Sequence, residues 1–550
     1  MIFTNMPTAK PTYILLLNGP HLQKWQWEAL RLVEEQNLAK PALIVIRNST
    51  AAKVNIFEKW KNYPFSSALF RIWKRFFLRI DAQSLYPLPP FLKNIPIHYI
   101  RPNPISAYKE AFPDEDLDFM RSFNADFMIR FGFNILSGEV LHICPHGILS
   151  YHHGDEMEYR GGPPGFWEIF KGESKTAAII QRLTEKLDAG PVLLKHQFIT
   201  QHHSYAGQLN RLLMESTPML AKAIRLIQQE NTIPQKPKAI RRFPNNSQFL
   251  LFLFILLQNR FRFYHTKFLK MEKWNIALAQ NGIFNPTQTQ LTPLISNKNG
   301  EYAADPFVWK DPSNAFVFYE HYSYASKKGS IRMLTIKDNK VLNTHTLLEN
   351  ETHFAYPFVF EHENKLYLAP ENMESGKWSA YELNPHKAEI GERKTLIDLP
   401  LIDATLLLHN SMYYIFAGLP KQANEALHIW YSPNLWGPYN AHPLNPVVAN
   451  PAEARMAGNF VQKNGQLFRP AQKCDRYYGE KIIWKKVDCL DPLSYSESTV
   501  GELNNTFNAK YPHGLHTFSQ HQDLCVLDFK MHRSDFISLV SQAKSLLHVF

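Results

Sequence analysis

The first 230 residues alternate between short apolar runs and longer stretches with apolar positions on one side. The apolar runs have the length and content of buried β-strands and occupy residues 13–17, 42–46, 97–100 and 127–131. Residues 22–35 place Trp25, Leu30 and Val33 on one side, which predicts a helix, and a second helix is expected over residues 176–187. Strands separated by helices predict a parallel α/β sheet with a site at the carboxyl ends of its strands. The first strand is not followed by GxGxxG, so a dinucleotide site is not expected.

From about residue 272 the pattern changes to a repeat of an apolar run, a polar turn and an aromatic-rich strand. The repeats begin at Asp305, Tyr356, Asp403, Gly458 and Gly514, at intervals of 51, 47, 55 and 56 residues. A period of this length with several strands in each repeat is typical of a β-propeller, so five repeats predict five blades. A β-sandwich with fortuitous spacing is the alternative.

A connector lies between these two regions and contains an apolar run at residues 249–257. The run is too short to cross a bilayer. It could form a helix in the membrane interface, flanked by Arg and Lys, or a helix buried between two domains, and the sequence leaves both interpretations open. We therefore expect an α/β domain at residues 1–230, a basic helical connector at 231–271 and a β domain at 272–550.

The net charge of +11 is concentrated in two short stretches. Residues 235–270 hold eight basic residues and residues 59–80 hold six, with no acidic residue in either stretch. Both stretches interleave the charge with Trp, Phe and Leu, a pattern that favours an anionic membrane surface over nucleic acid. The four cysteines show no paired spacing, and the first residues lack the long apolar core of a signal peptide. These features predict a cytoplasmic chain with peripheral attachment to the inner face of the membrane.

The densest group of polar residues is Ser150-Tyr-His152-His153-Gly-Asp155-Glu156. Arg160 lies eight residues after His152, and Asp188 lies 36 residues after it. An imidazole and a carboxylate suit the attack of an amine on a formyl carbon, which develops an oxyanion and must release a proton. The spacing of these residues resembles the 10-formyltetrahydrofolate-dependent formyltransferase family, which includes methionyl-tRNA formyltransferase and the sugar N-formyltransferases. The resemblance covers roughly residues 12–225.

This resemblance implies a Rossmann-like α/β fold with His152, Asp188 and Ser150 as catalytic residues. His152 would stabilise or shuttle charge, and Asp188 would orient it or take the proton of the amine. Ser150 stands where the family has asparagine, and a serine hydroxyl is a shorter donor than an amide. We expect either that a nearby donor such as His153 compensates or that activity is weak or altered.

The resemblance also implies binding residues for the two substrates. The loop that would face 10-formyltetrahydrofolate consists of Gly132, Phe133, Asn134, Ile135 and Leu136. The residues expected to bind the acceptor in this half of the chain are His153, Asp155 and Arg160.

The polar cluster at residues 150–156 has three interpretations other than a formyltransferase site. A metal could be held by His142, His146, His152, His153, Asp155 and Glu156, but their spacing matches no HExxH or similar motif, and no metal site is predicted. Ser150 as an acyl nucleophile lacks the GxSxG turn. A retained fold without catalysis stays an alternative because of Ser150.

The β-rich half resembles the N-terminal propeller domain of plant glucosamine inositolphosphorylceramide transferases and, more distantly, the five-bladed glycosidases. The matching stretches include Ala304-Asp-Pro-Phe307, Tyr356-Pro-Phe358, Ala454-Arg-Met-Ala-Gly458 and His513-Gly-Leu-His516. The resemblance implies an all-β five-bladed propeller over about residues 272–530, with polar residues that converge on an axial sugar-binding pocket. These residues are Asp305, Glu371, Asp403, Arg455, Arg469, Gln472 and His516.

Together the two resemblances predict formyl transfer from 10-formyltetrahydrofolate to the amine of an amino sugar, nucleotide- or lipid-linked, in surface glycan biosynthesis. One alternative is glycoside hydrolysis or transfer in the propeller, by a carboxylate pair such as Asp305 with Asp403 or Glu371. The other alternative is a glycan-binding protein in which both sites are catalytically degenerate.

Overall fold

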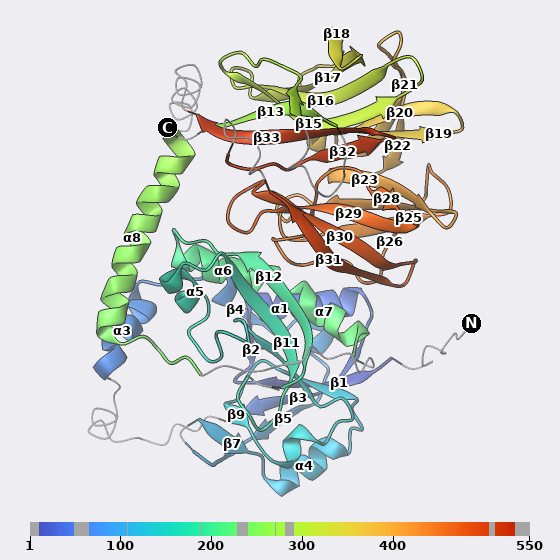
Figure 1. The fold of residues 1–550 in the computed structure, drawn as a ribbon. Helices are drawn as coiled ribbons and strands as arrows, with labels where there is room; N and C mark the ends of the chain where they lie inside the picture. The colour runs from blue at the N-terminus through green and yellow to red at the C-terminus, as the bar shows by residue number, and fades with distance from the viewer. Residues whose placement is uncertain are drawn as a thin grey trace. The chain divides into compact units, whose positions relative to one another are not determined.

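The chain is described by a computed structural model that covers residues 10–48, 65–106, 108–188, 190–227, 240–269, 271–280, 291–504 and 512–533 (Figure 1). It divides into two compact units, an N-terminal unit at residues 1–261 and a C-terminal unit at residues 262–550. The boundary falls inside helix α8 (Asn246–Leu269), within the expected connector. The basic residues Lys59, Lys61, Lys236, Lys238 and Lys270 lie outside the described residues.

A seven-stranded sheet forms the centre of the N-terminal unit. Its order is β12 (Val192–Ile199), β11 (Lys175–Arg182), β10 (Ile148–His152), β8 (Phe127–Arg130), β1 (Thr12–Leu17), β3 (Lys40–Arg47) and β5 (Ile97–Ile100). The strands from β10 to β5 are parallel, as expected, whereas β11 and β12 pair in antiparallel fashion. The sheet is therefore mixed, with an antiparallel hairpin at one edge.

The helix expected over residues 176–187 is wrong, because strand β11 occupies most of this range. Residues 176–181 are all buried, since β11 pairs with a strand on each side and both of its faces are covered. A strand buried on both faces lacks the alternation of a half-exposed strand, so its apolar pattern cannot be told from that of a buried helix.

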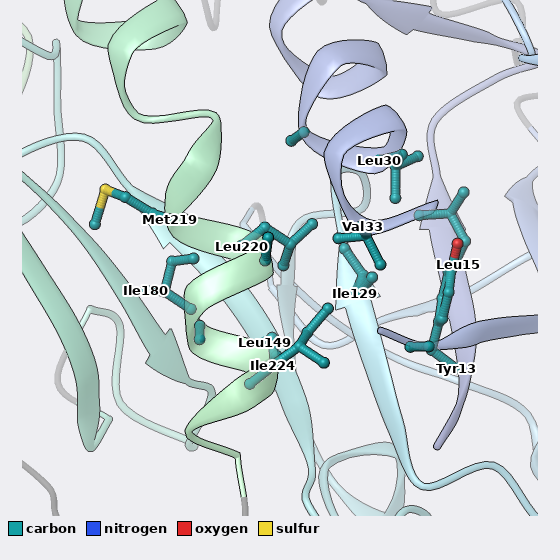
Figure 2. Packing of buried hydrophobic residues seen from close by; sticks show 14 of the residues in the cluster. Tyr13, Leu15, Leu30, Val33, Ile129, Leu149, Ile180, Met219, Leu220 and Ile224 are labelled. Atoms are coloured by element: carbon teal, nitrogen blue, oxygen red, sulfur yellow. The ribbon is translucent and has the colours of Figure 1, made fainter. Parts of the chain in front are cut away.

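Alternate side chains of the central strands supply two separate cores, because successive residues of a strand point to opposite faces. On one face, helices α1 (Lys24–Glu35) and α7 (Pro218–Arg225) pack against the sheet, with Leu30, Val33 and Leu220 buried beside Leu15 (Figure 2). On the other face, Leu16 packs with residues of α4 (Asp114–Arg121).

The other elements of the N-terminal unit are short. The strands are β2 (His21–Gln23), β4 (Leu85–Pro87), β6 (Asn103–Pro104), β7 (Lys109–Ala111) and β9 (Ile135–Leu136). The helices are α3 (Ala68–Phe76), α5 (Phe166–Lys171) and α6 (Tyr205–Glu215). Among the described residues, no helix is both long and apolar enough to cross a membrane.

Five antiparallel sheets make up the described part of the C-terminal unit. One joins the two ends of this part: β14 (Leu291–Pro293), β13 (Met271–Gln280), β33 (Leu524–Arg533) and β32 (Phe518–His521). Two follow in chain order as β15 (Glu301–Lys310), β16 (Ala315–Ser323), β17 (Lys328–Lys337) and β18 (Lys340–Leu348), then β19 (Ala355–His362), β20 (Lys365–Glu371), β21 (Trp378–Asn384) and β22 (Glu389–Ile397).

The last two sheets continue this order along the chain. One consists of β23 (Ile402–His409), β24 (Met412–Gly418), β25 (His428–Ser432) and β26 (Asn440–Ala441). The other consists of β27 (Arg455–Met456), β28 (Val461–Lys463), β29 (Gln466–Lys473), β30 (Lys481–Leu490) and β31 (Tyr495–Leu503). Strands β15, β19, β23 and β27 lie next to one another in turn, and a bridge between Gly458 and Phe518 leads back to the first sheet. The arrangement agrees with a propeller, and the number of blades in the whole chain stays a prediction.

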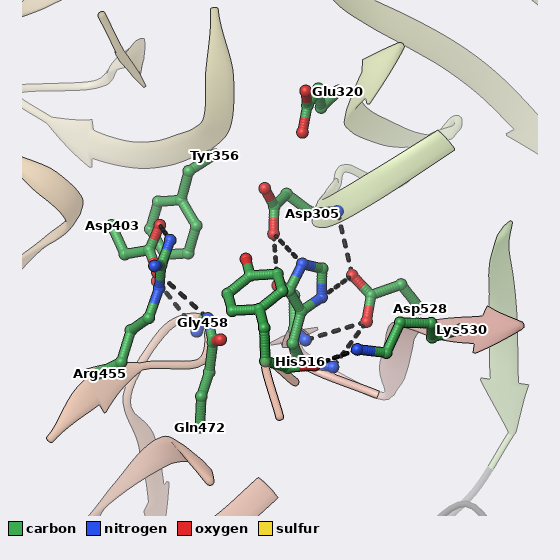
Figure 3. A network of polar contacts seen from close by, with 12 residues as sticks. Asp305, Glu320, Tyr356, Asp403, Arg455, Gly458, Gln472, His516, Asp528 and Lys530 are labelled. Carbon is green, nitrogen blue, oxygen red and sulfur yellow. Dashed lines mark hydrogen bonds and ion pairs between the residues drawn. The ribbon is translucent and has the colours of Figure 1, made fainter. Parts of the chain in front are cut away.

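Three of these sheets share a bulge near the start of the innermost strand. The register shifts after Ala304, Ala355 and Ile402, and the bulged residues Asp305, Tyr356 and Asp403 have φ angles of +49°, +42° and +50°. A bulge redirects the side chain of the extra residue. The bulged residues therefore present their side chains to one shared region (Figure 3).

Candidate functional site

Three neighbouring strands of the N-terminal unit bring a row of polar residues together. Ser150 on β10 pairs with Arg130 at the end of β8 and with Gln181 on β11, so the three side chains share one face of the sheet. Ser150 and Gln181 are buried. The Arg130 Nη1 donates to Ser150 Oγ at 3.2 Å. Arg130 was not among the predicted site residues. The only sequence feature that pointed to it is its position as a charged residue at the end of an otherwise apolar strand.

His152 lies two residues after Ser150 and so faces the same side of the sheet. Its Nε2 lies 3.0 Å from the carbonyl oxygen of Tyr159. Because a carbonyl can only accept, Nε2 carries the proton, and the Nδ1 is directed at Asp188 Oδ2 at 3.5 Å. A Cβ at Gly154 would lie 2.8 Å from this Nε2, so glycine leaves room for the imidazole. The structure thus brings together His152 and Asp188 as the sequence predicted.

Main-chain and side-chain bonds hold the Asp188 carboxylate in place. Its Oδ2 accepts from the Gly161 N–H at 3.1 Å, and its Oδ1 accepts from Gln181 Nε2 at 3.2 Å. Arg160 donates through Nε and Nη2 to the carbonyl of Leu187, the residue before Asp188. Arg160 therefore positions the turn that carries Asp188, whereas the sequence placed it among the acceptor-binding residues.

The loop at residues 131–136 is fixed by close backbone contacts. A Cβ at Gly132 would lie 2.3 Å from the Asn18 nitrogen, so only glycine fits there. The Phe133 N–H donates to Asn18 Oδ1 at 2.6 Å, and Asn134 donates through its N–H and Nδ2 to Glu110, at 2.7 and 3.1 Å.

Two further contacts complete this loop. Arg130 Nη2 donates to the carbonyls of Phe133 and Asn134, at 3.1 Å each. Ile135 and Leu136 form β9, which pairs with β7. The loop is thus preorganised beside the row formed by Arg130 and Ser150, and its role towards folate stays a prediction.

His153 and Asp155 lie elsewhere and do not join this group. The His153 ring stacks on Tyr151 at 5.6 Å and contacts Trp25, on the opposite face of the sheet from Ser150. Burial, with a smaller effect of His152, lowers the pKa of His153 to about 3. Asp155 forms an ion pair with Lys195 at 2.9 Å. His153 is therefore not the nearby donor that was expected to compensate for Ser150. The donor that contacts Ser150 is Arg130.

Arg130 combines burial with incomplete bonding. Burial lowers the pKa of its guanidinium, and the charges of Asp188 and Glu110 oppose this effect. Its Nε is buried and has no hydrogen-bond partner among the described residues, and the same holds for Gln181 Oε1. Unpaired buried donors and acceptors cost free energy, and such groups are found where a ligand completes the bonding.

In the C-terminal unit, a second polar group forms around His516 (Figure 3). Its Nδ1 lies 2.6 Å from Asp528 Oδ2, and its Nε2 lies 3.5 Å from Asp305 Oδ1. Its ring stacks on Trp274 at 3.8 Å. Asp305, His516 and Asp528 are all buried, and their ligand atoms lie close enough to share a metal ion. The Asp528 carboxylate already accepts from the main-chain N–H groups of Asp305, His516 and Thr517, so its lone pairs are largely used.

Asp403 is the centre of an adjoining group. Arg455 binds it through two nitrogens, at 2.5 and 3.2 Å, and Gln472 Nε2 donates to it at 3.1 Å. The Asp403 N–H donates to Glu371 Oε2 at 3.0 Å. Arg455 also lies over the ring of Tyr478 at 4.8 Å. Six of the seven predicted residues of this half therefore lie in these two adjoining groups.

Arg469 is the exception. It is fully buried and binds Glu497 through two nitrogens, at 2.7 and 2.8 Å, and the carbonyl of Glu453 at 2.7 Å. The structure therefore places Arg469 in an ion pair and not with the other predicted residues.

The sequence also missed Glu320 on β16, which joins the acidic groups of this region. Burial raises the pKa of Glu320 well above its usual range, and the charges of Asp305 and Glu371 raise it further. Burial likewise raises the pKa values of Asp305 and Glu371. Burial opposes the charged form of His516, but Asp528 and Asp305 raise its pKa overall. The region therefore holds more carboxyl groups than its cations can neutralise.

Comparison with known protein families agrees with both units. Residues 91–223 match the formyl transferase family, and this range contains Arg130, Ser150, His152, Gln181 and Asp188. Residues 258–522 match the N-terminal region of glucosamine inositolphosphorylceramide transferase 1. The chain joins a formyl transferase domain to a glucosamine inositolphosphorylceramide transferase 1 N-terminal domain.

Individual proteins resemble only one part of the chain each. Glucosamine inositolphosphorylceramide transferase 1 of Oryza sativa subsp. japonica is 31% identical over 228 residues, which cover 40% of this chain and 30% of that protein. The methionyl-tRNA formyltransferase of Clostridium tetani is 29% identical over 157 residues, which cover 28% of this chain and 49% of that protein. The chain thus spans less than half the length of these relatives.

Two solved structures also resemble parts of the chain. Glycinamide ribonucleotide transformylase 1 from Symbiobacterium toebii is similar with a TM-score of 0.28 and 14% identity, over 43% of this chain and 94% of that one. An exo-beta-1,3-galactanase from Phanerochaete chrysosporium is similar with a TM-score of 0.30 and 11% identity, over 36% of this chain and 50% of that one.

Proposed function

We propose that the N-terminal unit transfers a formyl group from 10-formyltetrahydrofolate to the amine of an amino sugar. The observation that carries this proposal is the approach of His152 Nδ1 to Asp188 Oδ2 at 3.5 Å, on the same face of the sheet as Ser150. The match of residues 91–223 to the formyl transferase family supports it.

The folate supplies the formyl group, and the residues of this chain handle the charge and the proton. The amine nitrogen bonds to the formyl carbon, the bond between this carbon and the donor nitrogen breaks, and a proton passes from the amine to the donor nitrogen. His152 Nδ1 is free to carry this proton because Nε2 is bonded to the Tyr159 carbonyl. Asp188 would stabilise the imidazolium, since its carboxylate is fixed by Gly161 and Gln181.

The loop at residues 131–136 would hold the folate. Its shape is set by the contact of Gly132 with Asn18 and by the bonds from Asn134 to Glu110, so it needs no reorganisation on binding. The buried and unpaired Arg130 Nε and Gln181 Oε1 fit a polar ligand at this place.

An amino sugar is proposed as the acceptor because of the second unit. Its relatives are named for glucosamine, an amino sugar, and for a ceramide, a lipid. The buried carboxyl groups of this unit offer hydrogen-bond acceptors for sugar hydroxyls and an ammonium group. Arg455 and Gln472, which lie beside Asp403, offer hydrogen-bond donors. A sugar linked to a nucleotide or lipid fits this chemistry, and the use would be in glycan biosynthesis.

The test uses the full chain with 10-formyltetrahydrofolate and a panel of nucleotide-linked amino sugars. We expect a product heavier by one formyl group, detected by mass spectrometry, and calorimetric binding of a stable 10-formyltetrahydrofolate analogue. His152→Ala should lower the turnover by about 100- to 10,000-fold without loss of folate binding. His142→Ala, an exposed histidine outside the site, is the matched control. No folate binding, or full turnover in His152→Ala, would refute the proposal.

Glycoside chemistry in the C-terminal unit is a second candidate. The raised pKa values of Asp305, Glu320 and Glu371 favour it, because a glycosidase needs one protonated and one ionised carboxyl group. In this case Asp305→Asn should abolish hydrolysis of aryl glycosides while sugar binding persists. Sugar binding without any turnover in the parent chain would instead indicate a glycan-binding unit.

A further inference from the structure

We propose that Arg130 is a catalytic residue that provides, with Ser150, the positive hydrogen-bond donor for the developing oxyanion. This inference rests on the proposed formyl transfer. The amide that the formyltransferase pattern places at position 150 is missing, and a guanidinium from the neighbouring strand contacts Ser150 in its stead.

The bonding of Arg130 directs its charge into the site. Nη2 is used by the carbonyls of Phe133 and Asn134, which fixes the plane of the guanidinium. Nη1 donates to Ser150 Oγ, and the serine hydroxyl donates over 3.4 Å to the Tyr151 carbonyl, a long bond that a ligand oxygen could replace. Nε is buried without a partner. Nε, together with a hydroxyl that can turn away from the Tyr151 carbonyl, can thus donate to a group that binds here.

The charge of Arg130 makes this arrangement stronger than an isolated serine. Hydrogen bonds from a charged donor are roughly twice as strong as those between neutral groups. The guanidinium lies in a buried site, where charge is screened less than in water. A developing oxyanion would therefore be stabilised by a fixed charge, which offsets the short reach of the Ser150 hydroxyl.

The experiment compares Arg130→Met, Ser150→Ala and the double variant Arg130→Met/Ser150→Asn in formyl transfer. Arg130→Met should lower kcat by about 100- to 1,000-fold with little change in KM for the amine. Ser150→Ala, which keeps the guanidinium, should lose less. The double variant restores an amide donor and should recover at least about tenfold over Arg130→Met.

Binding of the folate analogue by each variant shows that the loop at residues 131–136 is intact. If Arg130→Met binds poorly, Arg130→Lys, which keeps the positive charge, should retain more turnover than Arg130→Gln. Equal turnover of Arg130→Met and the parent, or no recovery in the double variant, would overturn the role of Arg130. A parent chain that transfers no formyl group would instead refute the proposed function itself.

A second inference concerns a surface formed by helix α3 and by residues 246–261 of helix α8, the part of α8 that belongs to the N-terminal unit. The rings of Phe70 and Trp73 on α3 lie 5.7 and 5.4 Å from that of Phe249 on α8. Asn246 links the helices further, since its Oδ1 accepts from the Leu69 N–H and its Nδ2 donates to the Phe65 carbonyl. The two helices therefore form one body, which we call the α3–α8 surface.

The α3–α8 surface leaves many apolar side chains exposed. On α8, Leu250, Phe254, Leu257 and Phe261 recur at helical spacing and are 56–72% exposed. Phe76 on α3 is 67% exposed. Residues 249–257 of α8 are apolar on all sides, and such a segment is expected to be covered all round. Here the packing within the N-terminal unit covers only the stripe that contains Phe249 and Phe252.

Charge identifies the occupant of this surface. Residues 65–80 and 240–269 contain no acidic residue. The exposed basic residues of these segments within the N-terminal unit are Lys74, Arg75, Arg79, Arg242 and Arg260. Apolar side chains bordered by cations alone match the interface of an anionic bilayer, so we infer that the α3–α8 surface lies on such a membrane.

The test is flotation of the full chain with vesicles of phosphatidylcholine, with and without phosphatidylglycerol. We expect binding only to the anionic vesicles, and at least a tenfold loss for the triple variant Phe254→Ser/Leu257→Ser/Phe261→Ser. Leu408→Ser/Leu493→Ser/Val500→Ser removes equally exposed apolar residues of the C-terminal unit and serves as the control. Unbound parent chain, equal binding by the triple variant, or a dimer that only the triple variant disrupts would overturn the inference.

Discussion

Two arginines, the half-buried Arg130 of the N-terminal unit and the fully buried Arg469 of the C-terminal unit, differ in how their donors are used. Arg469 is surrounded by acceptors: Glu497 binds it twice, and the Glu453 carbonyl binds it once. Burial alone would lower its pKa, but Glu497 and Tyr495 raise it overall. Arg130 has no hydrogen-bonded carboxylate, its pKa is lowered by burial, and its Nε is unpaired.

The difference in hydrogen bonding indicates that Arg469 stabilises the folded chain, whereas Arg130 is available to bind a ligand. An arginine whose charge is fully neutralised and whose donors are satisfied contributes to the folded state alone. An arginine that stays charged, buried and partly unpaired costs free energy in the empty site, and this cost is recovered when an anion binds or develops beside it. The predictions below test this distinction.

The largest expected effect follows from removal of Arg469 from its ion pair with Glu497. Arg469→Met leaves the Glu497 charge buried without its main partner and should lower the free energy of unfolding by about 3–5 kcal/mol. Arg130→Met removes a charge that burial already disfavours, so it should change the free energy by no more than about 1 kcal/mol. Equilibrium urea unfolding of the full chain measures both.

A double variant sharpens this result. Arg469→Met/Glu497→Leu replaces the whole pair by apolar groups, which is often close to neutral for a buried ion pair. We expect it to recover most of the stability lost in Arg469→Met. A larger loss in Arg130→Met than in Arg469→Met would contradict the comparison between the two arginines.

Local patterns predicted most of the strands, because apolar runs and repeat spacing are properties of the sequence itself. Strands β1, β3, β5 and β8 and the repeats that begin at Asp305, Tyr356 and Asp403 were found in this way. Strand β11 was missed because it is buried on both faces. Its antiparallel pairing with β10 and β12 depends on contacts that no local pattern contains.

The site was predictable only as far as motif spacing reached. The spacing from His152 to Asp188 predicted a pair that the structure brings together. Arg130 reaches Ser150 through the register of two strands, and Glu320 reaches Asp305 from the second strand of its sheet. Neither belongs to a motif, so strand pairing had to be known before their roles could be considered. Conversely, Arg469 was grouped with the site because of the resemblance to the propeller family, although its partner is Glu497.

A second prediction concerns the excess of acid around Glu320. Its pKa is raised in the folded chain, so the folded state binds more protons than the unfolded state, and the free energy of unfolding must fall as the pH rises above its unfolded value. Each pH unit between the two pKa values costs about 1.4 kcal/mol. Glu320→Gln keeps the shape without the charge and should be more stable than the parent at pH 8, but equal to it near pH 4.

Thermal unfolding between pH 4 and pH 9 measures this dependence. Glu382→Gln, an exposed carboxylate of the same unit that pairs with Lys365, is the control and should leave the pH dependence unchanged. Two results would contradict this prediction. The stability of the parent chain could stay constant between pH 5 and pH 8, or the stability of Glu320→Gln could fall as much as that of the parent. Either result would mean that Glu320 does not cause the pH dependence.

The smallest expected effect separates positioning from binding in the N-terminal site. Arg160 holds the Leu187 carbonyl with two nitrogens and so fixes the turn before Asp188. Arg160→Lys keeps the charge but offers a single ammonium group, so the turn should loosen and kcat for formyl transfer should fall by about three- to tenfold, with KM for the acceptor unchanged. Arg121→Lys, an exposed arginine paired with Asp118, is the control. A raised KM with unchanged kcat would instead identify Arg160 as an acceptor-binding residue, and would mean that the Leu187 contact does not set the position of Asp188.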